Sequence, residues 1–175
     1  MAWPRGRTVM TGCTRKLLWA LPVLAVILGI AHAAAPPINL FANPSFEDGR
    51  DGWHLDKGGT TDAKFSVEKT ATPTGEVAAL ITIGAVAEWG TQFGQTFDAG
   101  PPGKTYTFSV LARSTKGTVR ADIQIERRAK PYDRAARSEP FTLTSERWTE
   151  LHVTFRVEKP FPEGWFAYIS CTQPN

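Results

Sequence analysis

Four aromatic residues of this chain are candidates for an exposed binding platform: Trp53, Trp89, Tyr132 and Trp165. A flat aromatic ring can stack on the weakly polar C–H face of a sugar ring, and a contact of about 100 Å² contributes about 2–3 kcal/mol. Two or three such contacts, less the cost of association, give roughly micromolar to millimolar affinity. Sugar binding is therefore one chemistry that these residue types could support.

The four aromatic residues differ in how strongly the sequence predicts their exposure. Trp89 is the strongest candidate, because it lies in a polar turn where no pattern requires burial. Trp53 follows a glycine turn, so it is either a platform or a residue that plugs the core. Tyr132 lies in a charged loop that either walls a cleft or is simply solvated. Trp165 begins a strand and Trp148 precedes one, so we expect both to be structural.

Polar side chains on two predicted strands could hold the hydroxyl rim of the same ligand. They are Gln92, Arg120, Gln124 and Glu126. Arg120 and Gln124 suit this role because guanidinium and amide groups can make paired hydrogen bonds to neighbouring hydroxyls. The alternative is that the four side chains only cover a solvent-exposed sheet face.

Few residues could carry out catalysis. Outside the N-terminal leader described below, the histidines are His54 and His152, and neither belongs to a metal-binding spacing. The sequence contains no Gly-x-Ser-x-Gly nucleophile motif and no phosphate-binding loop. Asp122 and Glu126 could share a strand face, but such a pair usually forms a solvated stripe and not the opposed carboxyl groups of a glycosidase. We therefore expect no independent catalytic activity.

Alternation of apolar and polar residues predicts that the chain is built from strands. The alternation is clearest over Thr105–Arg113, where apolar residues stand at every second position. Val119–Arg127 shows the same alternation. Further strands are predicted at Ile38–Phe41, Phe65–Lys69, Val77–Ile83, Thr91–Phe97, Leu151–Val157 and Trp165–Cys171, with a charged loop over Arg127–Glu139. No helical period is present and Gly/Pro turns separate the strands. The sequence thus predicts an all-β, two-sheet antiparallel β-sandwich.

Three short motifs, in this order and spacing, resemble carbohydrate-binding modules of the 4/9 type. They are Asn39-Leu-Phe-Ala-Asn-Pro-Ser-Phe-Glu-Asp-Gly with Asp51-Gly-Trp53, then Gly103-Lys-Thr-Tyr-Thr-Phe-Ser with Ala112-Arg113, then Trp148 before the strand Leu151–Val157. The resemblance covers residues 38–175. It implies a galactose-binding-like jelly roll that binds polysaccharide without catalysis and belongs to a larger enzyme. The alternatives are a structural or adhesion module and an enzyme-accessory module, both without a sugar site.

The resemblance also implies a calcium ion and a final strand. Relatives often hold one structural calcium, and Glu47 matches the family's acidic position. Relatives usually finish with one more strand that carries acidic residues, whereas this sequence stops at Gln173-Pro174-Asn175. We expect either a fragment of a longer protein, which we favour, or a jelly roll that lacks its last strand and leaves an exposed edge. The missing acidic partners count against the calcium site.

Residues 1–33 are predicted to be a secretory signal peptide. Four basic residues precede an apolar run over Leu17–Ile30, and Ala31-His32-Ala33 fits a cleavage site. A transmembrane anchor is the alternative, but the run is shorter than the roughly 18 apolar residues that a span needs, and Pro22 interrupts it. Residues 34–37 then form a short linker, and residues 38–175 form one domain.

Removal of the leader changes the net charge and the cysteine content. The loss of four basic residues takes the formal net charge from +3 to −1, so composition gives no reason to expect nucleic acid or an anionic membrane as a partner. Cys13 lies in the leader, which leaves Cys171 alone and unable to form an intramolecular disulfide. We expect a buried, inert thiol, in a protein that is secreted, periplasmic or held at the cell surface.

Overall fold

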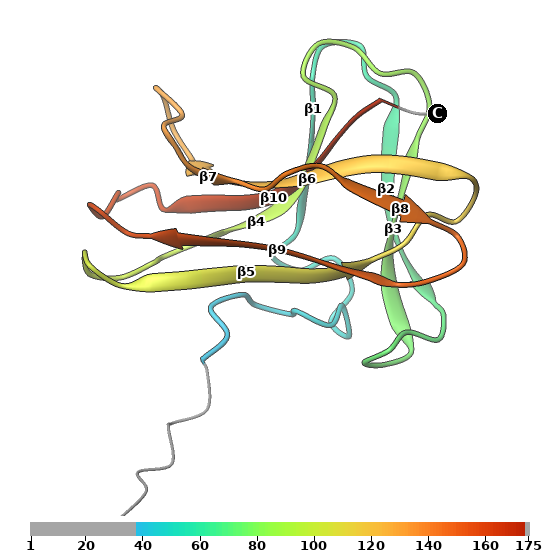
Figure 1. Cartoon of the computed structure of the whole chain (residues 1–175), viewed down its shortest axis with the longest axis horizontal. Helices are drawn as coiled ribbons and strands as arrows, with labels where there is room; N and C mark the ends of the chain where they lie inside the picture. Colours follow the sequence, from blue (N-terminus) through green and yellow to red (C-terminus); the bar gives the residue numbers. More distant parts are fainter. Residues whose placement is uncertain (1–37, 174–175) are drawn as a thin grey trace, which may run out of the picture. The chain divides into compact units, whose positions relative to one another are not determined.

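Residues 38–173 are the part of the chain that the computed structural model describes, and the predicted leader and linker lie outside them. All regular secondary structure in this part is β (Figure 1). The strands are β1 (His54–Lys57), β2 (Ala63–Lys69), β3 (Val77–Ile83), β4 (Thr91–Phe97), β5 (Thr105–Ala112), β6 (Thr118–Arg127), β7 (Arg134–Arg137), β8 (Phe141–Thr144), β9 (Thr149–Arg156) and β10 (Trp165–Gln173). Within the described residues, no helix is long and apolar enough to cross a membrane.

The larger sheet is antiparallel and has the strand order β1-β4-β10-β6-β7, with β8 paired to the first part of β6. Its register decides which side chains share a face, because side chains alternate along each strand and neighbouring strands align. In the middle of the sheet, Gln124 lies beside Tyr168 and Tyr168 lies beside Gly94. Their neighbours along β6 and β10, such as Ile125 and Ala167, face the other way.

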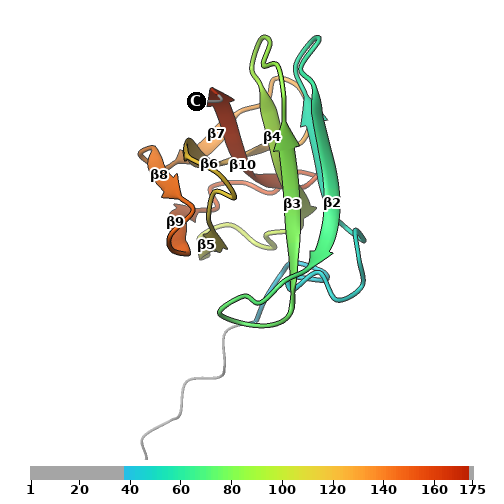
Figure 2. The same cartoon turned by 90° about the vertical axis from the view of Figure 1, so that its right-hand side faces the viewer.

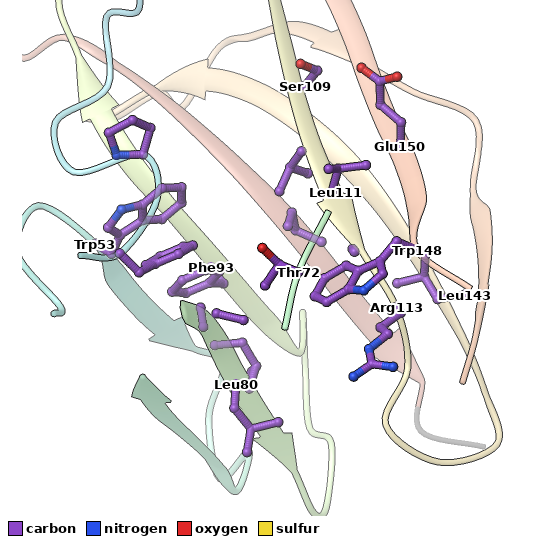
Figure 3. Close-up of a pocket in the computed structure, with 18 of the residues that line it drawn as sticks. Trp53, Thr72, Leu80, Phe93, Ser109, Leu111, Arg113, Leu143, Trp148 and Glu150 are labelled. Atoms are coloured by element: carbon purple, nitrogen blue, oxygen red, sulfur yellow. The ribbon is translucent and has the colours of Figure 1, made fainter. Parts of the chain in front are cut away.

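Two separate strand pairs cover the inner face of the larger sheet. One is β5 with β9 and the other is β2 with β3, which stand apart in Figure 2. The main core forms between the larger sheet and β5–β9, and includes Ile123, Ile125, Ala167, Phe108, Leu151 and Phe155. A smaller core forms under β2–β3, where Trp53 and Phe93 lie side by side (Figure 3). The two layers confirm the predicted sandwich.

Seven of the predicted strands are confirmed. β2, β3, β4, β5, β6, β9 and β10 begin and end within two residues of the predicted bounds. The apolar side of the clearest predicted strand, from Tyr106 to Ala112, packs against the main core as its alternation requires. Cys171 is half-buried at the edge of that core, so the thiol is less enclosed than we expected.

Three short strands are not predicted by the sequence. β7 and β8 lie in or just after the segment that we expected to be a charged loop, and β1 lies just after Trp53, where no strand was predicted. Each has four residues and pairs with a longer strand, β6 or β4. Their own sequences are too short to show a period, so the strand beside them decides their conformation.

The predicted strand Ile38–Phe41 is wrong. The chain there has no strand partner, and the amide of Gln95 takes the place of one. Gln95 Oε1 accepts a hydrogen bond from the Ala42 N–H at 2.7 Å, and Gln95 Nε2 donates to the Ala42 carbonyl at 2.9 Å. Positive φ angles at Asn43 (46°) and Phe46 (63°) then turn the chain away from an extended path. A side chain therefore holds this segment, which alternation alone cannot reveal.

Candidate functional site

The outer face of the larger sheet gathers polar side chains from five strands, and we call it the polar face. By register it includes His54, Asp56, Gln92, Gly94, Thr96, Arg120, Asp122, Gln124, Glu126, Arg134, Arg137, Phe166, Tyr168 and Ser170. The inner face of the same strands carries the apolar core. The alternation that forces Ile123 and Ile125 inward thus also forces Gln124 and Glu126 outward.

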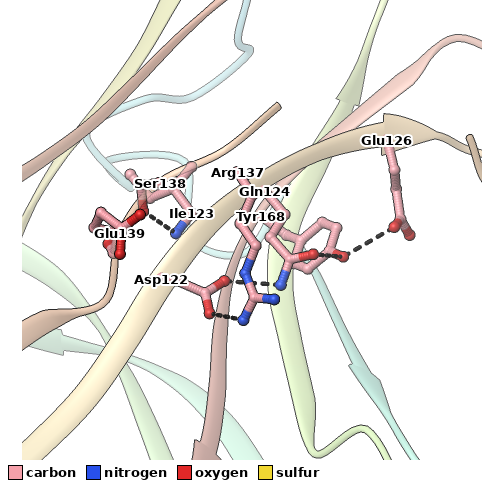
Figure 4. A network of polar contacts seen from close by, with 8 residues as sticks. All are labelled: Asp122, Ile123, Gln124, Glu126, Arg137, Ser138, Glu139 and Tyr168. Atoms are coloured by element: carbon pink, nitrogen blue, oxygen red, sulfur yellow. Dashed lines mark hydrogen bonds and ion pairs between the residues drawn. The ribbon is translucent and has the colours of Figure 1, made fainter. Parts of the chain in front are cut away.

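Five side chains of the polar face form one chain of hydrogen bonds (Figure 4). Arg137 Nη2 donates to Asp122 Oδ2 at 2.6 Å, and Gln124 Nε2 donates to Asp122 Oδ1 at 2.7 Å. The hydroxyl oxygen of Tyr168 lies 3.0 Å from Gln124 Oε1 and 2.9 Å from Glu126 Oε2. Asp122, Gln124 and Tyr168 are buried, and these bonds supply the partners that buried polar groups need.

The hydroxyl group of Tyr168 lies between two oxygen acceptors, although it has only one proton to donate. Asp122 fixes the orientation of the Gln124 amide, because the amide nitrogen must face the carboxylate and the amide oxygen must then face Tyr168. Tyr168 has a single hydroxyl proton for two oxygen acceptors. Tyr168 can donate either to the Glu126 carboxylate or to Gln124, and both contacts are satisfied together only when Glu126 carries a proton and donates it to Tyr168.

The electrostatic environment of Glu126 favours the same proton. Burial raises the pKa of Glu126 above its ordinary value, and the Tyr168 hydrogen bond and the charges of Arg134 and Arg128 offset only part of that rise. Burial also raises the pKa of Tyr168, and the nearby Glu126 adds to the effect. Both groups are therefore stabilised in their neutral forms.

Two stacked aromatic rings form the centre of the polar face. Phe166 and Tyr168 have ring centroids 5.0 Å apart and an interplanar angle of 27°. The guanidinium of Arg128 lies 4.2 Å from the Phe166 centroid, and its Nη1 is 2.6 Å from Asp56 Oδ2. Arg128 thus lies over the Phe166 ring, which is fully buried.

Gly94 makes room for the Tyr168 side of this face. A Cβ atom at Gly94 would lie 2.0 Å from the Ala167 carbonyl oxygen and 2.6 Å from Tyr168 Cβ. Neither neighbour can move easily, because one is backbone and the other is the root of a buried side chain. Only glycine therefore allows β4 and β10 to approach this closely here.

Trp89 and Tyr132 are exposed, as we expected from their loops. Their exposed fractions are 43% and 51%. Trp89 precedes β4, whose first residue pairs with Cys171, whereas Tyr132 follows β6, whose last residue pairs with Trp165 at the other end of β10. The seven-residue length of β4 separates these ends by roughly 20 Å. The two rings therefore lie beyond opposite ends of the same sheet.

Both exposed rings lie in tightly constrained loops. Trp89 packs on Gly58, where a Cβ would lie 3.0 Å from the indole Cδ2 atom. Its neighbour Glu88 has a φ of 49°, and Tyr132 itself has a φ of 61°. For residues other than glycine this backbone conformation is unfavourable by about 1–2 kcal/mol, and such conformations recur in binding loops.

Trp53 is not an exposed platform, which corrects one of the two interpretations that the sequence allowed. It is 7% exposed, and its ring stacks on Phe93 with centroids 5.1 Å apart. Its indole Nε1 donates to the Asn43 carbonyl at 3.0 Å, so the polar atom is satisfied inside the protein. Trp165 is buried, as we expected, and Trp148 is half-buried with Arg113 over its ring.

The four predicted polar partners all lie on the polar face but differ in access. Arg120 is exposed, and Gln92 and Glu126 are half-buried. Gln124 is buried, and its amide nitrogen bonds Asp122 while its amide oxygen bonds Tyr168, so it supports its neighbours and has little access to a ligand. The sequence reasoning overlooked Tyr168, and it considered Asp122 only as one of a pair of carboxylates with Glu126. The alternation of Phe166, Tyr168 and Ser170 with Ala167 and Ile169 was the signal that could have found the tyrosine.

The described side chains form no cluster of carboxylates that points to a calcium site. Among residues 38–173, no group of three or more His, Cys, Asp and Glu side chains lies close enough to hold a metal ion. Glu47 is exposed and belongs to no such group. Calcium in proteins takes six to eight oxygen ligands, usually several of them carboxylates, so the expectation attached to Glu47 has no support in the donor set.

Known structures share this architecture. A solved CBM4 structure matches with a TM-score of 0.58 at 18% identity, over 76% of this chain and 89% of that one. The N-terminal CBM22-1-CBM22-2 tandem domain of Paenibacillus barcinonensis Xyn10C matches with a TM-score of 0.57 at 18% identity, over 81% of this chain and 43% of the tandem. The CBM22-1 xylan-binding domain of Xyn10C matches at 0.50 and 15%, over 70% and 76%. At these identities the likeness establishes the jelly-roll fold.

The family follows from the sequence itself. No curated protein matches the chain significantly. The family model described as a carbohydrate binding domain, of the 4/9 type, matches residues 38–171. This range includes all three motifs on which the resemblance rests and nearly all of the described fold. The chain therefore belongs to the carbohydrate-binding domain family of the 4/9 type.

Proposed function

We propose that this chain is a non-catalytic module that binds one polysaccharide chain along the polar face, between Trp89 and Tyr132. One observation carries the proposal. The two exposed aromatic rings of the described residues lie beyond opposite ends of one sheet, and the outer face of that sheet carries a chain of hydrogen-bonded polar side chains. That arrangement suits an elongated ligand, because stacking can act at both ends and hydrogen bonding between them.

The accessible polar groups of this face are suited to sugar hydroxyls. Arg120, Gln92 and Glu126 offer a guanidinium, an amide and a carboxyl group, which together supply donors and acceptors. Gln124 and Tyr168 lie beneath and hold Glu126 in place. Because Tyr168 already holds the Glu126 carboxyl group, that side chain loses less conformational entropy on binding than a mobile one would.

The wider setting is also part of the proposal. The predicted signal peptide supports export, so we infer that the module works outside the cytoplasm. Membership of a carbohydrate-binding family supports a carbohydrate-active enzyme as the partner that the module serves. The absence of recognisable catalytic motifs in the sequence supports a role in binding and not in turnover.

Affinity electrophoresis in gels that contain soluble glucans, xylans or mannans tests this function. We expect at least one polysaccharide to retard the protein. Trp89→Ala and Tyr132→Ala should each weaken binding roughly 30- to 100-fold, the equivalent of about 2–3 kcal/mol of stacking. Ile38→Ala is the matched control, because Ile38 is 86% exposed and belongs to neither loop.

The alternative functions give different results in the same gels. A structural, adhesion or enzyme-accessory module would migrate alike in every gel, and the two aromatic variants would behave as the wild type. Release of reducing ends from any polysaccharide by the purified protein would overturn the non-catalytic assignment. Retardation that survives both aromatic substitutions would place the sugar elsewhere on the molecule.

A further inference from the structure

Two arginines of the polar face have no charged partner among the described residues. Arg128 and Arg137 are each ion-paired with an aspartate at 2.6 Å. The guanidinium groups of Arg120 and Arg134, in contrast, make no ion pair and no hydrogen bond within residues 38–173. Both side chains are exposed. Two positive groups on this face are therefore open to a ligand.

Arg134 belongs to the same end of the sheet as Tyr132. It begins β7, two residues after Tyr132, and its register partner on β6 is Glu126. Its positive charge acts on Glu126 and on Tyr168, so the guanidinium lies over the polar face and not away from it. An exposed ring and an unpaired guanidinium thus border the same part of the face.

Arg120 belongs to the opposite end, where Trp89 lies. It pairs with Gln173 on β10, and Cys171, two residues earlier on β10, pairs with Thr91 at the start of β4. Trp89 precedes Thr91 by two residues. The spacing of neighbouring strands places Arg120 about 10 Å across the sheet from the start of β4. The combination of a ring and an unpaired guanidinium therefore occurs at both ends of the face.

Glu126 is a poor counterion for Arg134. Its carboxyl group is held by Tyr168 at 2.9 Å (Figure 4). Burial and the charge of Asp56 favour its protonated form, whereas the charges of Arg134 and Arg128 favour the ionised form, and burial has the largest effect. A protonated Glu126 leaves the charge of Arg134 without compensation and does not repel an anion beside it.

The chemistry of a guanidinium specifies which anion suits these positions. Its parallel N–H groups lie in one plane and match the two oxygens of a carboxylate. A sugar hydroxyl can accept a hydrogen bond from the guanidinium, but it leaves the positive charge uncompensated once water is displaced. The carboxylate of a uronic acid projects from the rim of the sugar ring, so the ring can stack on an aromatic side chain while the carboxylate meets an arginine.

We propose that the ligand of the polar face is a polyuronate, whose carboxylates are held by Arg120 and Arg134 while Trp89 and Tyr132 stack on its sugar rings. This inference rests on the proposed function and names its substrate class. Arg120 and the register partner of Arg134 lie six residues apart on β6, about 20 Å along the strand. A chain with a carboxylate on every unit can reach both positions, whereas a single acidic sugar reaches one.

Matched ligands separate the charge of the polysaccharide from its shape. The probes are polyglucuronate, polymannuronate and polygalacturonate, each compared with its own methyl ester in affinity gels at pH 5. The ester keeps the sugar rings and linkages and removes only the charge. We expect the dissociation constant of at least one polyuronate to be roughly tenfold or more below that of its ester. No variant enters this comparison, so folding of the protein is not affected.

Arginine variants locate the carboxylates. Arg120→Gln and Arg134→Gln should each reduce the preference for the polyuronate over its ester about fivefold, which is the upper range for an accessible ion pair. Arg147→Gln is the matched control, because it removes the same charge from an exposed position in the turn between β8 and β9. It should keep the preference of the wild type.

Three outcomes would overturn the inference and leave the proposed function standing. The first is equal binding of every polyuronate and its ester. The second is a preference that survives both substitutions on the polar face. The third is equally strong binding of dextran sulfate, which would show that negative charge alone is recognised. If neither these probes nor the neutral glucans, xylans and mannans retard the protein, the proposed function itself fails.

Discussion

The hydroxyl oxygen of Tyr168 lies 2.9 Å from Oε2 of Glu126, and the same oxygen lies 3.0 Å from the amide oxygen of Gln124. A proton on Glu126 resolves the excess of acceptors, and burial raises the pKa of this carboxyl group in the folded protein. Glu126 therefore links the protonation state of the polar face to folding.

Stability should depend on the charge state of Glu126. Because its folded-state pKa is raised above its ordinary value of 4.5, its stabilising effect is complete below about pH 4.5 and is lost as the pH rises through the folded-state value. Glu126→Gln stays neutral and keeps a donor and an acceptor. We expect urea denaturation of this variant to lack the decline in stability with rising pH that Glu126 causes in the wild type.

Glu163 provides a control of opposite sign. Its hydrogen bond with Arg127 Nη2, at 2.6 Å, lowers the pKa of the carboxyl group. The stabilisation that ionised Glu163 gives the folded protein is present above pH 4.5, and it is lost as the pH falls through the pKa of Glu163 in the folded protein. Glu163→Gln should therefore change the acid side of the same curves. If both variants gave the same pH profile as the wild type, neither assignment would stand.

Gly94→Ala should prevent stable folding. The new Cβ would lie 2.0 Å from the Ala167 carbonyl oxygen in the middle of the sheet, so β4 and β10 would have to separate. We expect a loss of more than about 4 kcal/mol or no soluble protein, which is the range of severe core defects. Gly75→Ala is the matched control, because its Cβ would meet nothing closer than Glu47 Oε1 at 3.5 Å. Similar midpoints of thermal unfolding for the two variants would show that β10 tolerates a side chain here.

The Gln95 side chain should contribute to the free energy of unfolding through its two hydrogen bonds to Ala42. Replacement by leucine removes both hydrogen bonds to Ala42 and should cost about 1–3 kcal/mol, because the backbone groups lose their partners. Gln95→Glu keeps the acceptor for the Ala42 N–H but loses the donor to the Ala42 carbonyl. Its free energy of unfolding in urea should therefore lie between those of the leucine variant and the wild type. A leucine variant as stable as the wild type would show that water replaces the amide at no cost.

The sequence was sufficient to predict a strand and its buried face wherever period-two alternation spans seven or more residues. β5 and β6 are examples, because burial of Phe108 or Ile123 requires the intervening side chains to face outward. It failed where one long-range contact decides the local structure. Gln95 holds Ala42 across 53 residues of sequence, and the four-residue β7 exists because β6 lies beside it.

The candidate site was predictable in part for the same reason. Exposure of Trp89 followed from its polar turn, whereas burial of Trp53 depends on Phe93, which lies on β4 and is distant in sequence. The hydrogen bond that Gln124 accepts from Tyr168 joins β6 to β10, and no spacing within one strand encodes that pair. Strand order, which sets such neighbours, is a property of the whole fold.

Cys171 should react slowly although it is only half-buried. Burial, with a smaller effect of Asp122, raises the pKa of the thiol to about 11 from an ordinary 9.0. Since the thiolate is the reactive form, alkylation by iodoacetamide at pH 8 should be roughly 100-fold slower in the folded protein than in urea. The rate should rise with pH up to about 11. Mass spectrometry of the peptide that contains Cys171 measures this rate separately from Cys13, and equal rates in both states would mean that the thiol is neither shielded nor shifted.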